Sequence, residues 1–334
     1  MGGDKAPDVV IEGARDALSQ VEGIESIILV GDEARLRKLS AELGLTDSRA
    51  RFVQAEEVIE MHESAVRALR KKKKSSISIA TDLVKSGEAD AVVSAGNTGA
   101  AVAAATLKLR LLKGVERAGI ASPIPNEHGI CNILDAGANP EARPSHLVGY
   151  AVMGSVYAKH VLRCRDQAVV GLMSNGEEDE KGTAFTKETF SLLKELHDSG
   201  KADFNFVGNV EGHDLFETRL DVCLCDGFVG NVVLKSCEAT AKAMSKWLKL
   251  EFKRSPMRMM GAILSKGAFG AVKDRTNYES YGGSPLLGVN GVCIIAHGSS
   301  SALAIQNAIR VAAETVSHRV NIRIEEALAG LPGS

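Results

Sequence analysis

Short β-branched runs alternate with helical patterns along almost the whole chain, and this alternation constrains the fold more than any other feature. The predicted strands are 26–30, 91–94, 131–134, 169–173, 204–208, 222–225 and 292–296. Helical periodicity fills stretches between them, at 65–73, 100–111, 147–161, 187–197 and 302–317. Such alternation predicts an α/β protein with a largely parallel sheet that helices cover on both faces. Ligands bind these sheets beyond the carboxyl ends of the strands, so function is expected in the loops there.

The composition narrows the class of protein. A chain of 334 residues is long enough for one large domain or two lobes around a cleft. Aromatic residues make up only 4%, which disfavours a base-stacking surface for nucleic acid, and the formal charge of −2 selects no partner. No apolar run approaches the roughly 20 residues that cross a bilayer. The scattered cysteines indicate free thiols in a reducing cytoplasm, and no cluster of ligands suggests a metal or another cofactor.

Residues 236–272 break the alternation. They carry no strand signal and predict two helices with a turn near Pro256, a helical hairpin appended to a single α/β domain of 1–334. An apolar stripe flanked by cations suits the interface of an anionic membrane. The residues predicted to touch lipid are Trp247, Met257, Met259, Met260, Ile263, Leu264 and Phe269. The alternative is a hairpin that pairs two subunits with methionines in its core, and both can hold.

Three predicted strands lead into glycine-rich turns that open helices. Glycines let backbone amides approach a ligand, and the N-terminus of a helix favours an anion. Each turn can equally be an ordinary helix cap, and a turn aspartate or a lone histidine is often structural. The turns are Gly96-Asn97-Thr98-Gly99, Asp226 to Asn231 with Gly227, Gly230 and the following Lys235, and His297-Gly298-Ser299.

Two further loops add polar groups. One is DAGAN at 135–139, and the other is NGEEDEKG at 175–182, which contains Lys181. An acidic run is commonly a solvated surface, but Lys181 would suit an anion in a cleft. Together, the loops predict a phosphate-bearing ligand at one end of one sheet. No GxSxG, Walker A, HExxH or GxGxxG motif is present, which disfavours a covalent hydrolase, a kinase and a Rossmann dehydrogenase.

Nine motifs, in order along nearly the whole chain, resemble one family. They are MGGDKAP at 1–7, SAGNTGA at 94–100, LDAGAN at 134–139, MGSVYA at 153–158, EDEKG at 178–182, FVGNVEG at 206–212, CDGFVGN at 225–231, YGGSPLLGV at 281–289 and AHGSS at 296–300. These motifs resemble PlsX, the acyl-acyl-carrier-protein:phosphate acyltransferases of phospholipid synthesis. The resemblance implies a three-layer α/β/α sandwich like that of isocitrate/isopropylmalate dehydrogenases, with two intertwined lobes and usually a homodimer.

The resemblance also implies a reaction and its partners. Acyl carrier protein loaded with a fatty acyl group reacts with inorganic phosphate, giving acyl phosphate and free carrier protein. A membrane glycerol-3-phosphate acyltransferase then takes the product, which places the enzyme at the inner face of the membrane. The family has a strand of the type IAVDA before MGGD, whereas Met1 here begins at the loop. We therefore expect an unpaired sheet edge or a gap near Met1.

This reaction fits the candidate residues without a covalent intermediate. Phosphate is already a nucleophile, and a thiol with a pKa of about 8.5 leaves readily as thiolate. We predict that amides around 96–99 and 227–230 bind phosphate, with Lys181 or Lys235 balancing its charge. Asn231 and His297 would donate to the thioester carbonyl or protonate the sulfur. The predicted catalytic set is Asn231, His297, Lys181 and Asp226, and the predicted substrate-binding set is Gly96, Asn97, Thr98, Gly99, Gly227, Gly230, Lys235, Gly298 and Ser299.

A carrier protein is strongly acidic and needs a basic landing site. One dense run on a helix end supplies it, although the same run can be a solvated face. The run consists of Arg67, Arg70, Lys71, Lys72, Lys73 and Lys74. Three rival functions are a phosphotransacetylase-type enzyme that uses acyl-CoA, a decarboxylating dehydrogenase and a non-enzymatic membrane-associated scaffold of lipid synthesis. The dehydrogenase is disfavoured because no arginine cluster with paired metal-binding aspartates is apparent.

Overall fold

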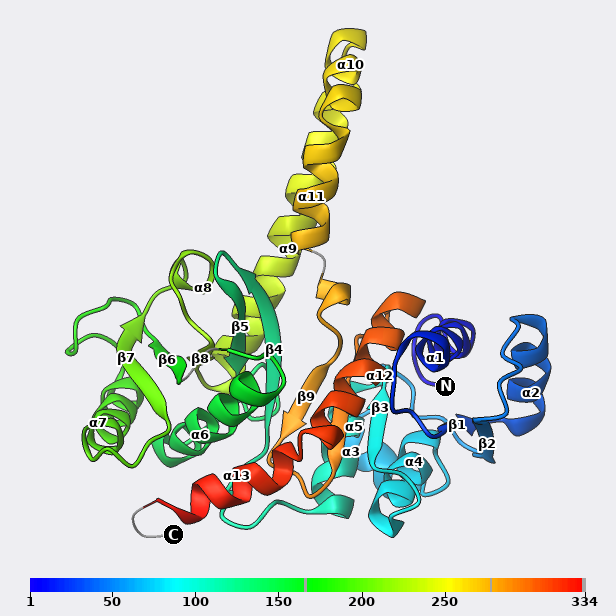
Figure 1. Ribbon diagram of the computed structural model, residues 1–334, viewed down its shortest axis with the longest axis horizontal. Helices are drawn as coiled ribbons and strands as arrows, with labels where there is room; N and C mark the ends of the chain where they lie inside the picture. Colours follow the sequence, from blue (N-terminus) through cyan, green and yellow to red (C-terminus); the bar gives the residue numbers. More distant parts are fainter. Residues whose placement is uncertain (165–166, 277, 332–334) are drawn as a thin grey trace.

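An eight-stranded sheet forms the centre of the molecule, and two further strands pair beside it (Figure 1). The computed structural model describes residues 1–164, 167–276 and 278–331. Across the large sheet the strand order is β3-β10-β9-β4-β5-β8-β6-β7, and β1 pairs with β2 in parallel. The strands are β1 (Ile27–Gly31), β2 (Ala50–Gln54), β3 (Ala91–Ser94), β4 (Gly119–Asn126), β5 (Gly129–Leu134), β6 (Ala168–Met173), β7 (Phe204–Val210), β8 (Val222–Leu224), β9 (Ser284–Leu287) and β10 (Val292–Ile295).

Helices cover both faces of the large sheet. Helices α6, α7, α12 and α13 pack on one face, and α4, α5 and α9 pack on the other. Neighbouring strand residues such as Ile294 and Ile295 enter opposite cores, as the pleat of a strand requires. The helices are α1 (Asp8–Gln20), α2 (Glu33–Glu42), α3 (Ala65–Lys71), α4 (Ser76–Ser86), α5 (Thr98–Ala104), α6 (Pro144–His160), α7 (Ala184–Asp198), α8 (Asp214–Glu217), α9 (Gly227–Phe252), α10 (Pro256–Leu264), α11 (Lys266–Thr276), α12 (Ala302–Ser317) and α13 (Val320–Ala329), with a π-helix at Ala105–Leu109 and a 3-10 turn at Tyr278–Ser280.

This architecture confirms the predicted α/β class, with a mostly parallel sheet between layers of helices. All seven predicted strands are present, with small differences in their ends. The sequence did not predict β2, β4 and β9. Strands β4 and β9 contain Pro123, Pro125 and Pro285, and proline normally argues against a strand inside a sheet.

The two unpredicted central strands reverse the direction of the sheet. Strand β9 is antiparallel to both β10 and β4, and β4 is antiparallel to β5. As a result, β3 and β10 run opposite to β5, β8, β6 and β7. The carboxyl ends of these two sets of strands therefore point to opposite sides of the molecule, along the direction of the strands. The prediction that all glycine-rich loops meet at one end is wrong for this reason.

A groove of about 1190 Å³ separates β1 from β3. Residues 26–30 and 90–94 line it from two sides, and Val10 of α1, Ala80 of α4 and Ile305 of α12 contribute to its walls. Strand β3 is an edge of the large sheet, and β1 belongs to the separate pair. The groove therefore lies between two sheet edges, beside the N-terminal loop.

Helix α9 begins in the body at Gly227, and its far end projects from the body with α10 and α11 beside it (Figure 1). The sequence predicts two helices here, whereas the structure has three. After α9, the returning segment is divided at Ser265 into α10 and α11. The rings of Phe252 and Phe269 pack edge to face, with their centroids 5.1 Å apart. The tip is largely bare, since Met257 is 85% and Leu264 is 81% exposed. No helix in the described ranges combines the length and the apolar character needed to cross a membrane.

Candidate active site

The predicted site residues fall into two groups, which lie at opposite ends of the strands of the sheet. The first group follows β3 and β10 and contains residues 96–99 and 297–299. The second follows β5, β6 and β8 and contains the 135–139 loop, Lys181 and residues 226–231. Strands β10 and β5 are three strand steps apart, or about 14 Å at about 4.8 Å for each step. The two groups therefore follow opposite ends of the strands and begin about three strand steps apart across the sheet.

The N-terminal loop joins the first group. The backbone of Gly3 lies so close to the ends of β3 and β10 that an added Cβ would be 2.5 Å from the carbonyl oxygen of Ala95 and 3.2 Å from that of Gly298. The Asp4 N–H donates to the Gly298 carbonyl over 2.9 Å. Asp4 and Lys5 are exposed beside this contact. Both lie in the MGGDKAP motif, but no local pattern in the sequence shows that this segment meets residues almost 300 positions away.

Asn97 uses its whole side chain to hold loops together. Its Oδ1 accepts the Ala100 N–H over 3.0 Å and caps α5. Its Nδ2 lies 3.1–3.2 Å from the carbonyl oxygens of Glu60, Met61 and Glu63. Both N–H groups of the amide and one lone pair of Oδ1 are therefore engaged, so Asn97 holds the 60–63 segment against the start of α5, and substrate binding by Asn97 stays a prediction.

The first turn of α5 presents two exposed backbone amides. Thr98 and Gly99 are solvent-exposed, whereas Gly96 is half-buried. In the part of the chain that the structure describes, no acceptor is assigned to the amides of Thr98 and Gly99. Initial amides of a helix have no partner within the helix and point along its axis. They can therefore meet an anion at the end of β3.

His297 lies at the end of β10 on a well-anchored turn. Its Nδ1 is 3.2 Å from the Ser299 nitrogen and 2.8 Å from the Ser299 Oγ. Gly298 is buried, and an added Cβ there would lie 2.8 Å from the Met61 methyl carbon. The imidazole itself is exposed, so its Nε2 is available to a substrate.

The start of α9 follows the structural alternative for this turn, in which an aspartate satisfies backbone amides. The Asp226 carboxylate accepts the N–H groups of Phe228 and Val229, each over 2.9 Å. The Gly227 N–H donates to the Asn139 carbonyl, and the Gly230 N–H donates to the Asp226 carbonyl. All four amides of this turn are therefore engaged within the chain. The prediction that they bind phosphate is wrong, and Asp226 is the cap of α9.

Gly227 and Gly230 are required by close contact with the 135–139 loop. A Cβ at Gly230 would overlap the carbonyl oxygen of Asp135, and one at Gly227 would lie 2.7 Å from the Asn139 carbonyl oxygen. Asp135 is fully buried, and its carboxylate accepts the amides of Ile120, Gly137, Ala138 and Asn139 over 2.6–3.1 Å. Asp135 thus fixes the loop on which the first turn of α9 rests.

The remaining residues of the second group, Asn231, Lys235 and Lys181, are exposed. Asn231 lies beside Gly137. The Nζ of Lys235 is 3.0 Å from Glu238 Oε2, and that of Lys181 is 4.0 Å from Glu178 Oε2. Both lysines therefore have a carboxylate nearby, which reduces the charge that they offer to phosphate.

The basic run on α3 is divided by its contacts. Lys72 pairs with Glu63 over 2.6 Å, and Lys74 pairs with Glu56 over 2.9 Å. Arg67, Arg70, Lys71 and Lys73 are exposed. Among the described residues, none of these four has an ion pair. Because α3 follows the 60–63 segment that holds Asn97, this patch adjoins the first group.

The cysteines are poorly suited to act as nucleophiles. Cys131, Cys223, Cys225 and Cys293 are buried and reduced, as the sequence predicts. Burial raises the pKa of Cys223 and of Cys293 to about 12. A thiolate is the reactive form of cysteine, so these thiols are inert near neutral pH.

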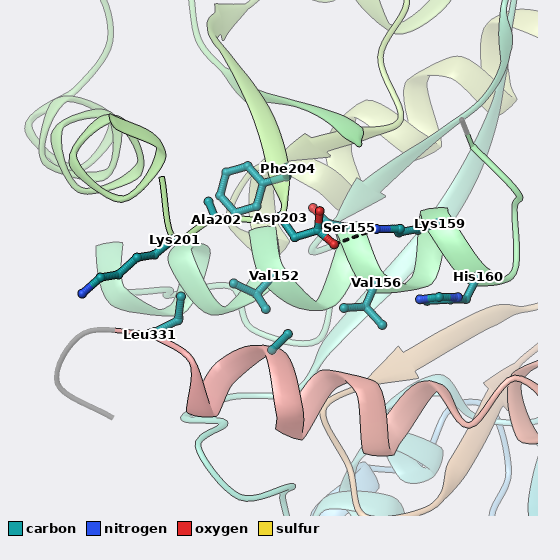
Figure 2. A pocket seen from close by; sticks show the side chains of 11 residues that line it. Val152, Ser155, Val156, Lys159, His160, Lys201, Ala202, Asp203, Phe204 and Leu331 are labelled. Atoms are coloured by element: carbon teal, nitrogen blue, oxygen red, sulfur yellow. Dashed lines mark hydrogen bonds and ion pairs between the residues drawn. The ribbon is translucent and has the colours of Figure 1, made fainter. Parts of the chain in front are cut away.

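Two other features lie apart from both groups. In the described ranges, Glu177, His213 and Asp214 could together hold a metal ion, but both oxygens of Asp214 already accept hydrogen bonds from Thr218 and Glu211. Figure 2 shows a crevice of about 90 Å³ between α6, α13 and β7, where Lys159 pairs with Asp203 over 2.7 Å. Ligand pockets usually measure about 300–1,000 Å³, so this crevice is too small for an acyl substrate.

Comparisons with known proteins agree with this picture. Residues 1–323 match a family model described as "Fatty acid synthesis protein". The chain is 61% identical over 331 residues to a phosphate acyltransferase of Akkermansia muciniphila, covering 99% of this chain and 95% of the relative. It is 49% identical to a phosphate acyltransferase of Pelotomaculum thermopropionicum, covering 96% of this chain and 91% of the relative.

Solved structures share the fold at low sequence identity. A phosphotransacetylase from Streptococcus pyogenes has a TM-score of 0.58 at 18% identity, covering 93% of this chain and 92% of that one. The EutD phosphotransacetylase from Staphylococcus aureus has a TM-score of 0.57 at 14% identity, covering 92% of each chain. The family match and the close relatives both extend over nearly the whole chain, so this chain belongs to the fatty acid synthesis protein family that its nine motifs resemble.

Proposed function

We propose that the chain transfers a fatty acyl group from acyl carrier protein to inorganic phosphate, giving acyl phosphate for phospholipid synthesis. The observation that carries this function is 61% identity, over 99% of the chain, to a protein named phosphate acyltransferase. An enzyme that transfers acyl groups to phosphate follows from the family. The carrier-protein donor is the finer part of the proposal and comes from the motif resemblance and the basic patch on α3.

The reaction needs no covalent intermediate on the protein. A phosphate oxygen attacks the thioester carbonyl carbon, a C–O bond forms, and the C–S bond breaks. The sulfur leaves with the electron pair as a thiolate, since a thiol with a pKa of about 8.5 is a good leaving group. The buried cysteines and the absence of an activated serine motif agree with direct attack.

We place this chemistry in the first group. The exposed amides of Thr98 and Gly99 suit phosphate, and His297 suits the carbonyl oxygen. Orientation of two reactants can contribute about 7–11 kcal/mol, and one oxyanion donor about 3–4 kcal/mol. Lys181, Lys235 and Asn231 lie at the opposite end of the strands and remain predicted site residues. They suit a distant part of the substrate better than the reacting atoms.

The exposed cations of α3 provide a docking site for an acidic carrier protein. Replacing Arg67 and Arg70 together with glutamate is expected to raise the KM for acyl carrier protein about fivefold to tenfold, because long-range attraction guides association. The kcat and the KM for phosphate should stay unchanged. The control is the double variant Lys187→Glu/Lys201→Glu, with one residue on α7 and one just before β7, measured by the same steady-state kinetics. Equal KM values in the two double variants would exclude the α3 site.

The identity of the donor separates this function from its nearest rival. A phosphotransacetylase-type enzyme would use acyl-CoA, and the solved structures show that the same fold serves proteins with that name. Release of free thiol should be measured with palmitoyl-carrier protein and with short acyl-CoA under equal conditions. Faster release from the carrier protein supports the proposal, and release from acyl-CoA alone would support the rival. A non-enzymatic scaffold would release neither thiol.

The hairpin suits delivery of the product to a membrane glycerol-3-phosphate acyltransferase. We propose that its stem pairs two subunits and that its tip touches the inner face of the membrane. Trp247, Met259, Met260, Ile263 and Phe269 are exposed along with Met257 and Leu264. Cations flank the tip, although Arg254 and Arg258 already pair with Glu251.

The predicted relation of the fold to isocitrate/isopropylmalate dehydrogenases stays part of this proposal.

Substituting Met257 and Leu264 with glutamate should weaken binding to anionic lipid vesicles at least about tenfold, because burying one such side chain contributes about 1.5–3 kcal/mol. Vesicle sedimentation measures this effect. Ile322→Glu, at a half-exposed apolar residue of α13, should leave binding unchanged. Vesicle binding that survives in the double variant would exclude the tip as the lipid contact.

A further inference from the structure

Ser299 contacts the imidazole of His297 in two ways. The Ser299 backbone nitrogen lies 3.2 Å from Nδ1, and the Ser299 Oγ lies 2.8 Å from the same atom. The turn beneath them is held by the Ser300 N–H, which donates to the His297 carbonyl over 3.0 Å, and by the bond from Asp4 to Gly298. Ser299 therefore holds the His297 ring at Nδ1, and Nε2 is left for the substrate.

These contacts decide where the imidazole carries its proton. A backbone N–H can only donate, so Nδ1 must accept the bond from Ser299. A neutral imidazole has one N–H, and the partner of one nitrogen fixes the state of the other. These two donors favour the neutral tautomer with its proton on Nε2, in which the Ser299 hydroxyl also donates to Nδ1. A proton on Nδ1 would instead face the Ser299 N–H at 3.2 Å.

We propose that Ser299 is a positioning residue that holds His297 in the Nε2–H tautomer, so that His297 donates a hydrogen bond to the thioester carbonyl oxygen. This inference rests on the proposed function and changes the predicted role of Ser299, which was substrate binding. Both ring nitrogens of the neutral imidazole are occupied, one by its proton and one by Ser299. His297 is thus a donor and not a base, and its proton stays on Nε2 while the C–O bond forms and the C–S bond breaks.

A positioning role predicts a specific kinetic pattern. Ser299→Ala removes the hydroxyl but keeps the backbone N–H, so the ring loses one of two restraints. The kcat should fall about tenfold, because small misplacement of a donor costs much of its effect. The KM values for phosphate and for acyl carrier protein should stay within about twofold, and Ser299→Thr, which keeps a hydroxyl, should restore the kcat. A changed KM for phosphate with normal kcat would instead indicate direct substrate binding and overturn the proposal.

The tautomer can be read without turnover. Long-range ¹H–¹⁵N correlation spectra of the full chain, with ¹⁵N-labelled histidine, distinguish a proton on Nε2 from one on Nδ1. His297→Gln identifies the signal by its loss. We expect Nε2–H in the wild type and the wild-type pattern in the control Ser191→Ala on α7. Ser299→Ala keeps the 3.2 Å backbone contact but loses the 2.8 Å hydroxyl contact, so a larger share of Nδ1–H is expected in that variant. A wild-type proton on Nδ1, or an unchanged tautomer and kcat in Ser299→Ala, would overturn the assignment.

The two readouts separate this inference from the proposed function. Acyl phosphate formation by a wild type with its proton on Nδ1 overturns the inference and leaves the function standing. A wild type with the Nε2–H tautomer that forms no acyl phosphate overturns the function, and with it the role of His297 as a donor to the thioester.

Discussion

Replacing His297 with alanine is expected to lower the kcat for acyl phosphate formation about 100-fold, since removal of one donor to a developing oxyanion typically costs about 10²–10³ in rate. The exposed ring lies at the end of β10, in the group that also presents the amides of Thr98 and Gly99. Its loss removes a contact that forms most strongly in the transition state, so the KM for phosphate should change little. Initial rates of thiol release measure both constants.

A matched histidine tests the specificity of this effect. His197 lies at the C-terminal end of α7 and is partly exposed, but it belongs to neither group. His197→Ala should retain wild-type kinetics, and thermal unfolding should show that both variants are folded. A folded His297→Ala enzyme with the wild-type kcat would move the oxyanion donor elsewhere, with Asn231 as the next candidate to replace by alanine.

Replacing Asp135 with alanine is expected to lower the free energy of unfolding by about 3–4 kcal/mol, because the buried amide of Ile120 and the part-buried amides of residues 137–139 lose their acceptor, and an unsatisfied buried group costs about 1–3 kcal/mol. Asp135 is fully buried and joins the start of β4 to the 135–139 loop. That loop carries the Asn139 carbonyl on which Gly227 rests. Equilibrium urea unfolding, followed by far-UV circular dichroism, measures the loss.

An asparagine at the same position gives the matched comparison. Three amides share Oδ1 of Asp135, and the amide of Asn139 bonds Oδ2. Asparagine keeps one oxygen acceptor, so Asp135→Asn should be destabilised less than Asp135→Ala. Equal stability of the wild type and the alanine variant would show that other contacts hold this loop.

Local sequence patterns predicted much of the fold because buried strands and amphipathic helices leave local signals. The strand at 292–296 and the helix at 302–317, for example, match β10 and α12 closely. Strands β4 and β9 were missed because proline is rare in central strands, yet here these strands run through the middle of the sheet. The antiparallel pairing of these two strands determines which loops lie at the same end of the strands. Because the two strands were missed, the second group of site residues was placed at the wrong end.

The predicted site was less accurate because a glycine-rich turn has the same local sequence whether it binds a ligand or packs closely. Gly227 and Gly230 open a helix after a strand, as a phosphate-binding turn would. Only the three-dimensional structure shows that their amides donate to the carbonyls of Asn139 and Asp226, and that a side chain would clash with the 135–139 loop. The same limit applies to Asn97, whose partners lie more than 30 residues away. His297 needed no distant partner, and its exposed position agrees with the prediction.

The identity of the acceptor tests the central claim most directly. Palmitoyl-carrier protein should be incubated with the enzyme, with and without inorganic phosphate, and the product should be trapped with hydroxylamine. We expect release of the carrier thiol only when phosphate is present, together with an equal amount of acyl hydroxamate. Thiol release at the same rate without phosphate, or with free fatty acid as the only product, would contradict acyl transfer to phosphate.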